Sequence, residues 1–331
     1  MARIGMNPSR TKTTDYRPAR VTVAILVHIP HFAGYYAHRL EVLKASMWSL
    51  LHNTHTPHDL MVFDNGSCRE AAAYLDGLQQ GGAIAFLLRS GQNLGKIGAL
   101  TVLFGAAPGE IVAYADDDFF YHPGWLEAQV SVLDTFPSVG MVSGYAVPTF
   151  FAADRIGSNL KFAEENREVE VERACEIPAP LIREWAESTG RAPDDAVAEA
   201  SQYQPFRLTY RGVSALGAAN HDQFVCYKRV MLGCLPGSWS GQLMGQMLEL
   251  DRAVDQGGYL RLATATRTTQ HIGNVVSPAL AAQLPQDWGS QSASWATRGR
   301  PGMRRRLLEW APVRGLLLGI YSHLFRWINP E

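Results

Sequence analysis

The chain has 331 residues, a formal net charge of −1 and hydrophobic residues at 47% of its positions. This length and composition suit one large folded domain with a substantial core. The nearly balanced charge excludes a global attraction to polyanions, so no nucleic-acid partner is expected.

The N-terminus and the cysteines both indicate a cytoplasmic protein. Residues 1–20 are polar and basic without an apolar segment, so we interpret them as a disordered arm rather than a secretory signal. No stretch reaches the roughly 20 apolar residues that a membrane-spanning helix needs. Cys226 and Cys234 could pair in an oxidising compartment, but we expect all four cysteines to be free thiols in a reducing cytoplasm.

Strand and helix patterns alternate along the first third of the chain. The continuous apolar run at 21–29 predicts a buried parallel strand, and the apolar face of 35–51 predicts a helix. The later predicted elements are strands at 59–63, 83–88 and 110–115 and helices at 70–78 and 96–104. This rhythm predicts a parallel α/β sheet whose ligands bind beyond the carboxyl ends of the strands.

The remainder of the predicted domain is less regular. The predicted elements are a strand at 139–148, apolar alternation at 206–213 and 223–227, a helix at 242–256 and a strand at 259–263. Residues 163–200 are rich in Glu, Arg and Ala and are interrupted by prolines, which indicates a helical insertion. We therefore predict one domain over residues 21–290 with a variable insertion at 150–205.

Three adjacent aspartates, Asp116, Asp117 and Asp118, follow the strand predicted at 110–115. Their mutual repulsion raises their pKa values unless a cation or hydrogen bonds compensate. Carboxylate oxygens are ligands that Mg²⁺ and Mn²⁺ prefer, and Mg²⁺ often bridges carboxylates to substrate phosphates. We expect Asp116 and Asp118 to aim at one ligand and Asp117 to point elsewhere. The alternative is a solvated acidic turn.

Three motifs occur near the ends of successive predicted strands: MVFDNGSCRE at 61–70, RSGQNLGKIGAL at 89–100 and YADDDFFYHPGWLE at 114–127. In this order they resemble the Asp-Asn-Gly-Ser turn, the Asn-x-Gly segment and the Asp-x-Asp region of glycosyltransferase family 2. The resemblance implies an A-type fold with a mostly parallel central sheet flanked by helices. It also implies a metal-dependent, inverting transfer of a sugar from a nucleoside diphosphate sugar to an acceptor hydroxyl.

The resemblance assigns roles to individual residues. Asp64 would read the nucleotide base and Asp116 would lie near the ribose, while Asp118 would hold Mn²⁺ or Mg²⁺ at the diphosphate. The loop that passes close to the nucleotide would contain Asn93, Gly95 and Lys96. The alternatives are that Asp64 only closes an Asx-turn and that Lys96 is a solvated helix cation.

Two later segments extend the resemblance to about Ile272. LGAANHDQFVCYKRV at 216–230 resembles the strand-turn-strand that lines the donor sugar. His271 falls where many such enzymes place a histidine that binds the metal or the diphosphate. The alternative is that His271 is a polar residue of a surface loop.

The sequence departs from the family at the catalytic base. The family usually has Glu-Asp about eleven or twelve residues before the glycine of a Gly-Tyr pair, and this chain has Gln246 and Met247 there. We predict Glu249 as the base, with Asp251 second. Positions two apart on a helix point about 200° away from each other, so the two carboxylates should not both face the acceptor.

The C-terminal residues 291–331 interleave arginines with Leu, Trp, Tyr and Phe. Such a segment suits contact with the anionic inner face of a membrane, and equally suits packing on the domain or on a second subunit. The acceptor is expected to be a glycan, a lipid-linked molecule or a protein, and polysaccharide biosynthesis fits membrane contact.

Two other functions remain open. A catalytically inactive sugar-nucleotide-binding scaffold is favoured by Gln246 and Met247 in place of the usual acids. A nucleotidyltransferase would also use acidic metal ligands, but it normally carries a Gly-rich basic loop after the first strand. This chain has HIPHF there, at residues 28–32.

Overall fold

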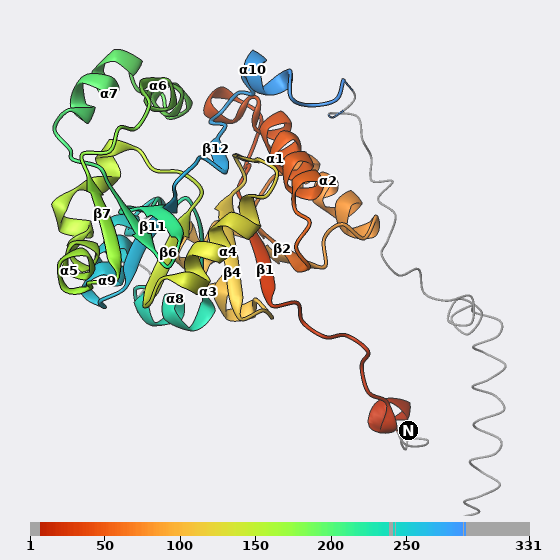
Figure 1. Ribbon diagram of the computed structural model, residues 1–331. Coiled ribbons are helices and arrows are strands. Elements are labelled where there is room, and N and C mark those ends of the chain that lie inside the picture. Colours follow the sequence, from red (N-terminus) through yellow and green to blue (C-terminus); the bar gives the residue numbers. More distant parts are fainter. Residues whose placement is uncertain (1–6, 238–240, 242, 287, 289–331) are drawn as a thin grey trace, which may run out of the picture. The chain divides into compact units, whose positions relative to one another are not determined.

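The structure is a computed structural model that describes residues 7–237, 241, 243–286 and 288 (Figure 1). Contacts divide the chain into one unit of Met1–Arg17 and Trp295–Glu331 and a second unit of Pro18–Ser294. In the first unit, the described residues contain the short 3-10 helix Pro8–Thr11 within the predicted arm. The predicted basic tail, residues 291–331, lies outside the described residues.

A ten-stranded sheet forms the centre of the second unit. Its strands are β1 (Val21–Val27), β2 (His58–Asn65), β3 (Phe86–Ser90), β4 (Ile111–Asp116), β6 (Val139–Ser143), β7 (Val169–Arg173), β8 (Phe206–Tyr210), β9 (Val213–Leu216), β10 (Gln223–Tyr227) and β11 (Leu260–Thr264). Their order is β3-β2-β1-β4-β10-β6-β11-β9-β8-β7. Strands β10, β9 and β7 run opposite to the others. The predicted α/β class with a mostly parallel central sheet, as expected of an A-type glycosyltransferase, is confirmed.

Helices cover both faces of this sheet. They are α1 (Arg39–Asn53), α2 (Arg69–Gln80), α3 (Gly95–Ala106), α4 (Trp125–Thr135), α5 (Gly157–Glu165), α6 (Ala179–Ser188), α7 (Pro193–Ala200), α8 (Lys228–Cys234), α9 (Met247–Gln256) and α10 (Pro278–Ala281). The apolar sides of α3, α8 and α9 share one core cluster with Phe224 and Cys226 of β10. The alternate β10 residue Gln223 instead bonds to Gln129 of α4, so α4 covers the opposite face.

Both faces of the central strands are therefore buried. All seven residues of β1 are buried, as the uninterrupted apolar run in its sequence predicts for an inner parallel strand. The sheet places β1 between β2 and β4. The chain adds β2 and β3 on one side of β1 and then crosses back to add β4 on its other side. Ligand sites in α/β sheets form at such a reversal of strand order.

A two-stranded ribbon lies apart from the main sheet. It pairs β5 (Phe119–Tyr121), which directly follows the three aspartates, with β12 (Thr269–His271) in antiparallel register. The sequence did not predict this ribbon, because three-residue strands are too short for a periodic pattern. The ribbon brings residue 271 to the end of β4.

The insertion at 150–205 is mostly helical, as predicted, but it also contributes β7 to an edge of the sheet. The alternation of Val169 and Val171 with Glu170 and Glu172 fits an edge strand with one exposed face. The predicted strand at 139–148 ends at Ser143, and the predicted helix at 242–256 begins only at Met247.

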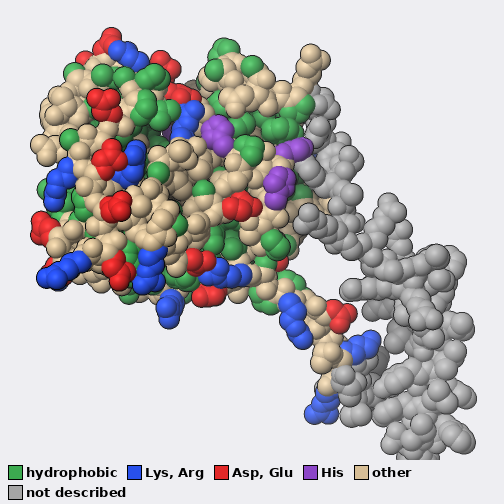
Figure 2. Space-filling model, viewed as in Figure 1, with side chains coloured by type: hydrophobic (Ala, Val, Ile, Leu, Met, Phe, Trp, Pro, Cys, Tyr) green, Lys and Arg blue, Asp and Glu red, His purple; other side chains and the backbone are tan. Residues whose placement is uncertain are grey.

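The surface and the cysteines agree with the composition. Figure 2 shows acidic and basic side chains interspersed over one face of the molecule. The four cysteines, all within the described part, carry free thiols. Among the helices that the structure describes, none is both long and apolar enough to cross a membrane.

Candidate active site

A cavity of about 230 Å³ lies beyond the carboxyl ends of β1, β2 and β4. Each strand supplies polar lining from its last residue or the one after it: His28 after β1, Asn65 from β2 and Asp116 from β4. The other charged residues of the lining are Arg39, Lys96, Asp117 and Asp118. The site thus occupies the edge that the parallel sheet predicts, and it concentrates carboxylates beside two cations.

Asp116 is paired with a buried lysine. The Nζ atom of Lys96 donates to both carboxylate oxygens of Asp116, and the hydroxyl of Tyr114 donates to Oδ1 at 2.5 Å. The Lys96 side chain is only 5% exposed, so Lys96 is not a solvated helix cation. Its backbone N–H also donates to the carbonyl of Leu243, another residue of the cavity lining.

Asp117 and Asp118 share one arginine. Nη1 of Arg39 donates to Oδ2 of Asp118 at 2.7 Å, and Nη2 donates to Asp117. Among the side chains of the protein, Asp118 therefore shares its partner with Asp117 rather than with Asp116, and whether Asp116 and Asp118 aim at one bound ligand stays a prediction. Asp116 turns to Lys96 on α3, and the buried guanidinium from α1 holds the other two carboxylates together.

The three carboxylates differ in their ionisation. Burial raises the pKa of Asp117 to about 7 in spite of Arg39. Burial also raises the pKa of Asp116, against the opposing effect of Lys96. For Asp118, burial is outweighed by His271 and Arg39, which hold its pKa below the usual value. Asp118 is therefore the aspartate of this cluster that stays ionised over the widest range of pH.

The ribbon places His271 beside Asp118. The backbone N–H of Ile272 donates to the carbonyl of Asp118 at 2.7 Å, which anchors β12 to the aspartate loop. As a result, Nε2 of His271 lies 3.3 Å from Oδ2 of Asp118, while Nδ1 lies 2.8 Å from Oγ of Ser188. Burial alone would lower the pKa of His271, but Asp118 raises it overall.

Asp118 and His271 are a donor set that suits a divalent cation. Within the described part of the chain, Oδ1 of Asp118 is buried and has no hydrogen-bond partner. A carboxylate oxygen and an imidazole nitrogen are both common ligands of first-row metals. The described residues contain no group of three or more His, Cys, Asp or Glu side chains placed to hold a metal. The two residues therefore fit an ion that takes its other ligands from substrate phosphates and water, as Mg²⁺ often does.

Asn93 joins the loops on the other side of the cavity. Its Oδ1 accepts from Nδ2 of Asn65 at 2.9 Å and from the N–H of Gly95 at 2.8 Å. Its Nδ2 donates to Nε2 of His28 at 3.0 Å, and Nδ1 of His28 is 2.9 Å from the carbonyl of Asn65. Gly66, at a φ of +81°, permits this approach, because a Cβ there would lie 3.0 Å from the backbone of Asn93. These loop residues thus form one hydrogen-bonded wall.

Asp64 lies behind this wall. Its carboxylate accepts the N–H of Ser67, three residues on, at 2.9 Å and lies 3.3 Å from Nε of Arg89. The side chain is buried, and the cavity wall contains the neighbouring Asn65. Asp64 therefore shapes the turn that carries Asn65, although the bond to Ser67 spans one residue more than the Asx-turn of the alternative interpretation.

The two predicted bases occupy different environments on α9. Glu249, in the first turn, is exposed. Asp251 is 1% exposed and lies 2.7 Å from Nη2 of Arg261 and 2.8 Å from Nδ1 of His221. A buried, ion-paired carboxylate has no access to an acceptor hydroxyl, so Asp251 does not fit the role of a direct base.

Sequence reasoning missed Arg39. The residue shares the buried side of α1 with Leu43, Met47 and Leu50. A single arginine in line with an apolar stripe was the available signal, because a buried arginine needs acidic partners elsewhere in the fold.

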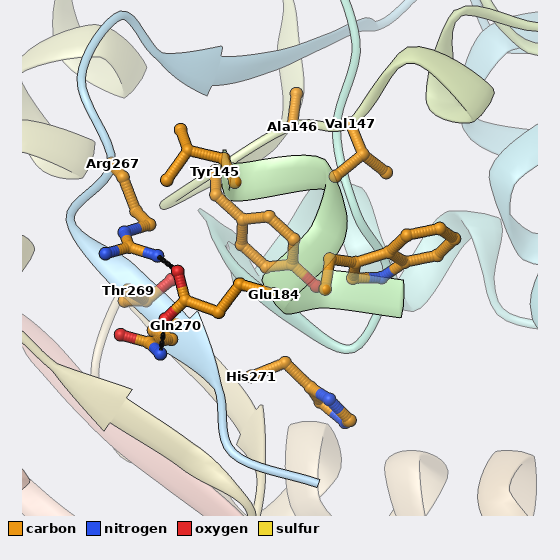
Figure 3. Close-up of a pocket in the computed structure, with 10 residues that line it drawn as sticks. Tyr145, Ala146, Val147, Glu184, Arg267, Thr269, Gln270 and His271 are labelled. Atoms are coloured by element: carbon orange, nitrogen blue, oxygen red, sulfur yellow. Dashed lines mark hydrogen bonds and ion pairs between the residues drawn. The ribbon is translucent and has the colours of Figure 1, made fainter. Parts of the chain in front are cut away.

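The insertion is attached to the ribbon through α6. The carboxylate of Glu184 accepts from Arg267 at 2.6 Å and from Gln270, and all three residues line the small pocket in Figure 3. One helical turn after Glu184, Oγ of Ser188 lies 2.8 Å from Nδ1 of His271. The backbone of Ser188 also lies beside Gly273, whose φ is +80°. A Cβ on Gly273 would lie 2.4 Å from the carbonyl oxygen of Ser188. The insertion therefore supports the histidine of the candidate metal site.

Replacement of Gly273 by alanine should destabilise the fold by about 2–4 kcal/mol, because a left-handed conformation and a backbone clash act together. Gly258 is a matched control, since its φ is +77° and a Cβ there would meet nothing within 4 Å. Gly258→Ala should cost only about 1–2 kcal/mol. Urea unfolding measures both values. Equal losses would show that the contact with Ser188 does not constrain the ribbon.

Together, the fold and the cavity define an α/β protein with an acidic, cation-lined site at the strand ends. Residues 29–178 match the model of glycosyl transferase family 2. The resemblance predicted from the three motifs is thereby confirmed for this part of the chain. No curated protein matches the chain.

Three solved structures with detectable likeness are distant from this chain. One is GalNAc-T7 with UDP, GalNAc and Mn²⁺, with 13% identity over 78% of this chain and 44% of that chain and a TM-score of 0.47. The mannosyltransferase PcManGT from Pyrobaculum calidifontis, with GDP-Man and Mn²⁺, has 22% identity over 45% and 43% and a TM-score of 0.34. S. aureus TarS 1-349 with UDP-GlcNAc has 14% identity over 40% and 38% and a TM-score of 0.31. Each match spans less than half of the solved chain.

Proposed function

We propose that the protein is a glycosyltransferase that moves a sugar from a nucleoside diphosphate sugar to an acceptor hydroxyl, with inversion at the anomeric carbon. The observation that carries the proposal is the cavity beyond β1, β2 and β4, whose lining includes Asp118 and the hydrogen-bonded pair Asn65 and Asn93. His271 lies 3.3 Å from Asp118. The family match over residues 29–178 supports the same class of reaction.

The nucleotide would lie along the wall formed by the loops after β1, β2 and β3. Asn93 and Gly95 are fixed there by backbone and side-chain hydrogen bonds, and Lys96 places a positive charge at the cavity. Asp116, paired with Lys96, would lie near the ribose. Asp64 would act on the base through the turn that it closes with Ser67.

The diphosphate would lie near Asp118 and His271, which would hold Mn²⁺ or Mg²⁺. When bound, such an ion neutralises the charge that develops on the leaving diphosphate. The transition state resembles an oxocarbenium ion, as in glycoside hydrolysis. Of the chain's own groups, Arg39 keeps Asp117 and Asp118 together at this end of the cavity.

Transfer also requires a group that accepts the proton of the acceptor hydroxyl. Of the two carboxylates predicted for this role, Glu249 is exposed and Asp251 is buried. The proposed acceptor is a glycan, a lipid-linked molecule or a protein in the cytoplasm. Contact of the tail with a membrane or a second subunit remains a prediction, since the tail lies outside the described residues.

One observation favours a second function. Gln246 and Met247 occupy the positions of the family's usual Glu-Asp pair, and neither side chain accepts a proton usefully. A chain of this kind could bind a sugar nucleotide as an inactive scaffold. A nucleotidyltransferase gains no comparable support, because the loop after β1 is HIPHF rather than a Gly-rich basic loop.

The proposal predicts release of nucleoside diphosphate from one member of a panel of uridine, guanosine and thymidine diphosphate sugars. Release should require Mn²⁺ or Mg²⁺ and should stop on chelation with EDTA. Metal-dependent donor binding without release, with water and with cell-extract acceptors, would favour the inactive scaffold. Pyrophosphate-dependent formation of nucleoside triphosphate would indicate a nucleotidyltransferase. Absence of binding to every donor would overturn the proposal.

A further inference from the structure

The segment at 216–230, which resembles the lining of the donor sugar, contains an acidic residue with a defined position in the site. The backbone carbonyl of Asp222 accepts the N–H of Asp116 at 3.0 Å, so Asp222 directly adjoins the aspartate cluster. Its side chain is 37% exposed, whereas the side chain of Asp251 is 1% exposed. Asp222 therefore combines closeness to the cavity with access from solvent.

The turn that carries Asp222 is fixed on several sides. The N–H of Asp222 donates to Oδ1 of Asn220 at 3.2 Å, and Nδ2 of Asn220 donates to the hydroxyl of Tyr145 at 2.6 Å. The N–H of Asn220 donates to Oγ of Ser143, at the end of β6. A turn held this way keeps the position of its carboxylate, which general base catalysis requires.

His221 connects Asp222 to the buried acid. Nδ1 of His221 lies 2.8 Å from Oδ2 of Asp251, and Nε2 lies 3.5 Å from Oδ1 of Asp222. Asp251 is itself paired with Arg261, so it is fixed in place. Burial would lower the pKa of His221, but Asp222 and Asp251 raise it overall. The imidazole therefore lies between the two carboxylates and links the half-exposed Asp222 to the buried Asp251.

Asp222 also lies within electrostatic reach of both ends of the proposed site. It raises the pKa of Lys96, although burial and Asp116 have larger effects on that group. It likewise contributes to the raised pKa of His271, after burial and Asp118. The Asp222 carboxylate therefore acts electrostatically on one charged group of the proposed nucleotide side and on one of the proposed metal side.

We propose that Asp222 is the catalytic base of the transfer and that His221, held by Asp251, positions it. This inference rests on the proposed function and replaces Glu249 in the role. The acceptor oxygen forms a bond to the anomeric carbon while the bond from that carbon to the diphosphate oxygen breaks. The diphosphate leaves with the electron pair of that bond, and the acceptor proton passes to the Asp222 carboxylate.

The test uses the full chain with Mn²⁺ and the donor selected from the nucleotide-sugar panel, with water as the acceptor. Asp222→Asn should lower kcat by about 10²–10⁴-fold, the usual contribution of a general base. The dissociation constant of the donor, measured by calorimetry, should change less than about threefold, because asparagine keeps the shape of the side chain. Asp134→Asn on α4 is the matched control, because Asp134 lies outside the cavity and its side chain is 34% exposed, and it should keep kcat within about threefold of the wild type.

His221→Asn tests the positioning role. It should lower kcat less than Asp222→Asn, and the double variant should be no slower than Asp222→Asn alone, because His221 acts through that carboxylate. A multiplicative loss in the double variant would overturn the role of His221.

Other results separate the two proposals. Asp222→Asn with kcat within tenfold of the wild type, or a large loss in Glu249→Gln, would overturn the assignment of Asp222. A loss of donor affinity in Asp222→Asn as large as its loss of kcat would also overturn the assignment of Asp222. A wild-type chain that releases nucleoside diphosphate from no donor would instead overturn the proposed function, and the assignment of Asp222 with it.

Discussion

Replacement of Asp118 by alanine should lower metal-dependent release of nucleoside diphosphate by about 10³-fold or more, because charge stabilisation by a bound ion contributes several kcal/mol. The same change should weaken the dependence of donor binding on Mn²⁺. Asp118 is the carboxylate whose pKa lies below its usual value, and its Oδ1 has no hydrogen-bond partner in the described part of the chain. Arg39 keeps Asp117 as a partner in the variant, so the fold should survive.

The control for Asp118 is an aspartate outside the cavity. Asp134 on α4 pairs with Arg20 near the surface, and its side chain is 34% exposed. Asp134→Ala should leave release and the metal dependence of binding unchanged. Metal-stimulated release by Asp118→Ala within about tenfold of the wild type would contradict the role of Asp118 in the metal site.

Replacement of Arg39 by methionine should lower the free energy of unfolding by about 3–5 kcal/mol, the usual cost of removing one partner from a buried ion pair. Methionine keeps much of the apolar volume of the arginine stem, so the loss should arise from charge rather than from a void. Two carboxylates, Asp117 and Asp118, would remain buried without their shared cation. Urea unfolding in EDTA measures the effect without a bound metal.

Arg20→Met is the matched control, because its pair with Asp134 is exposed on both sides. Exposed pairs contribute up to about 1 kcal/mol, so this variant should stay close to the wild type. Adding Asp117→Asn to Arg39→Met should restore part of the lost stability, because it removes one unpaired charge. Similar losses in Arg39→Met and Arg20→Met would show that Arg39 does not compensate the acidic cluster.

Local patterns in the sequence were sufficient to predict the class of the sheet and its strands β1 to β4. The apolar run that became β1 and the stripe that became α1 each specify an element through nearby residues. The aspartates at the end of β4 then follow from the rule that parallel sheets bind ligands at that edge. The family resemblance added His271, which the structure places 3.3 Å from Asp118.

The partners of these residues could not be predicted in the same way, because they come from distant parts of the chain. Arg39 and Asp117 are 78 positions apart, and the periodicity of α1 does not specify which carboxylate its arginine meets. Asp251 looked like an available acid on a helix. It is buried because β11 supplies Arg261 and the turn before β10 supplies His221, and neither contact is encoded near residue 251.

The attachment of α6 to β12 limits how this protein can be recombined with its relatives. A chimera that exchanged only residues 150–205 would separate Glu184 from Arg267 and Gln270, and Ser188 from His271. Such a graft would alter the histidine of the proposed metal site together with any acceptor contacts that it was meant to import. Residues 267–273 should therefore be exchanged with the insertion as a single cassette.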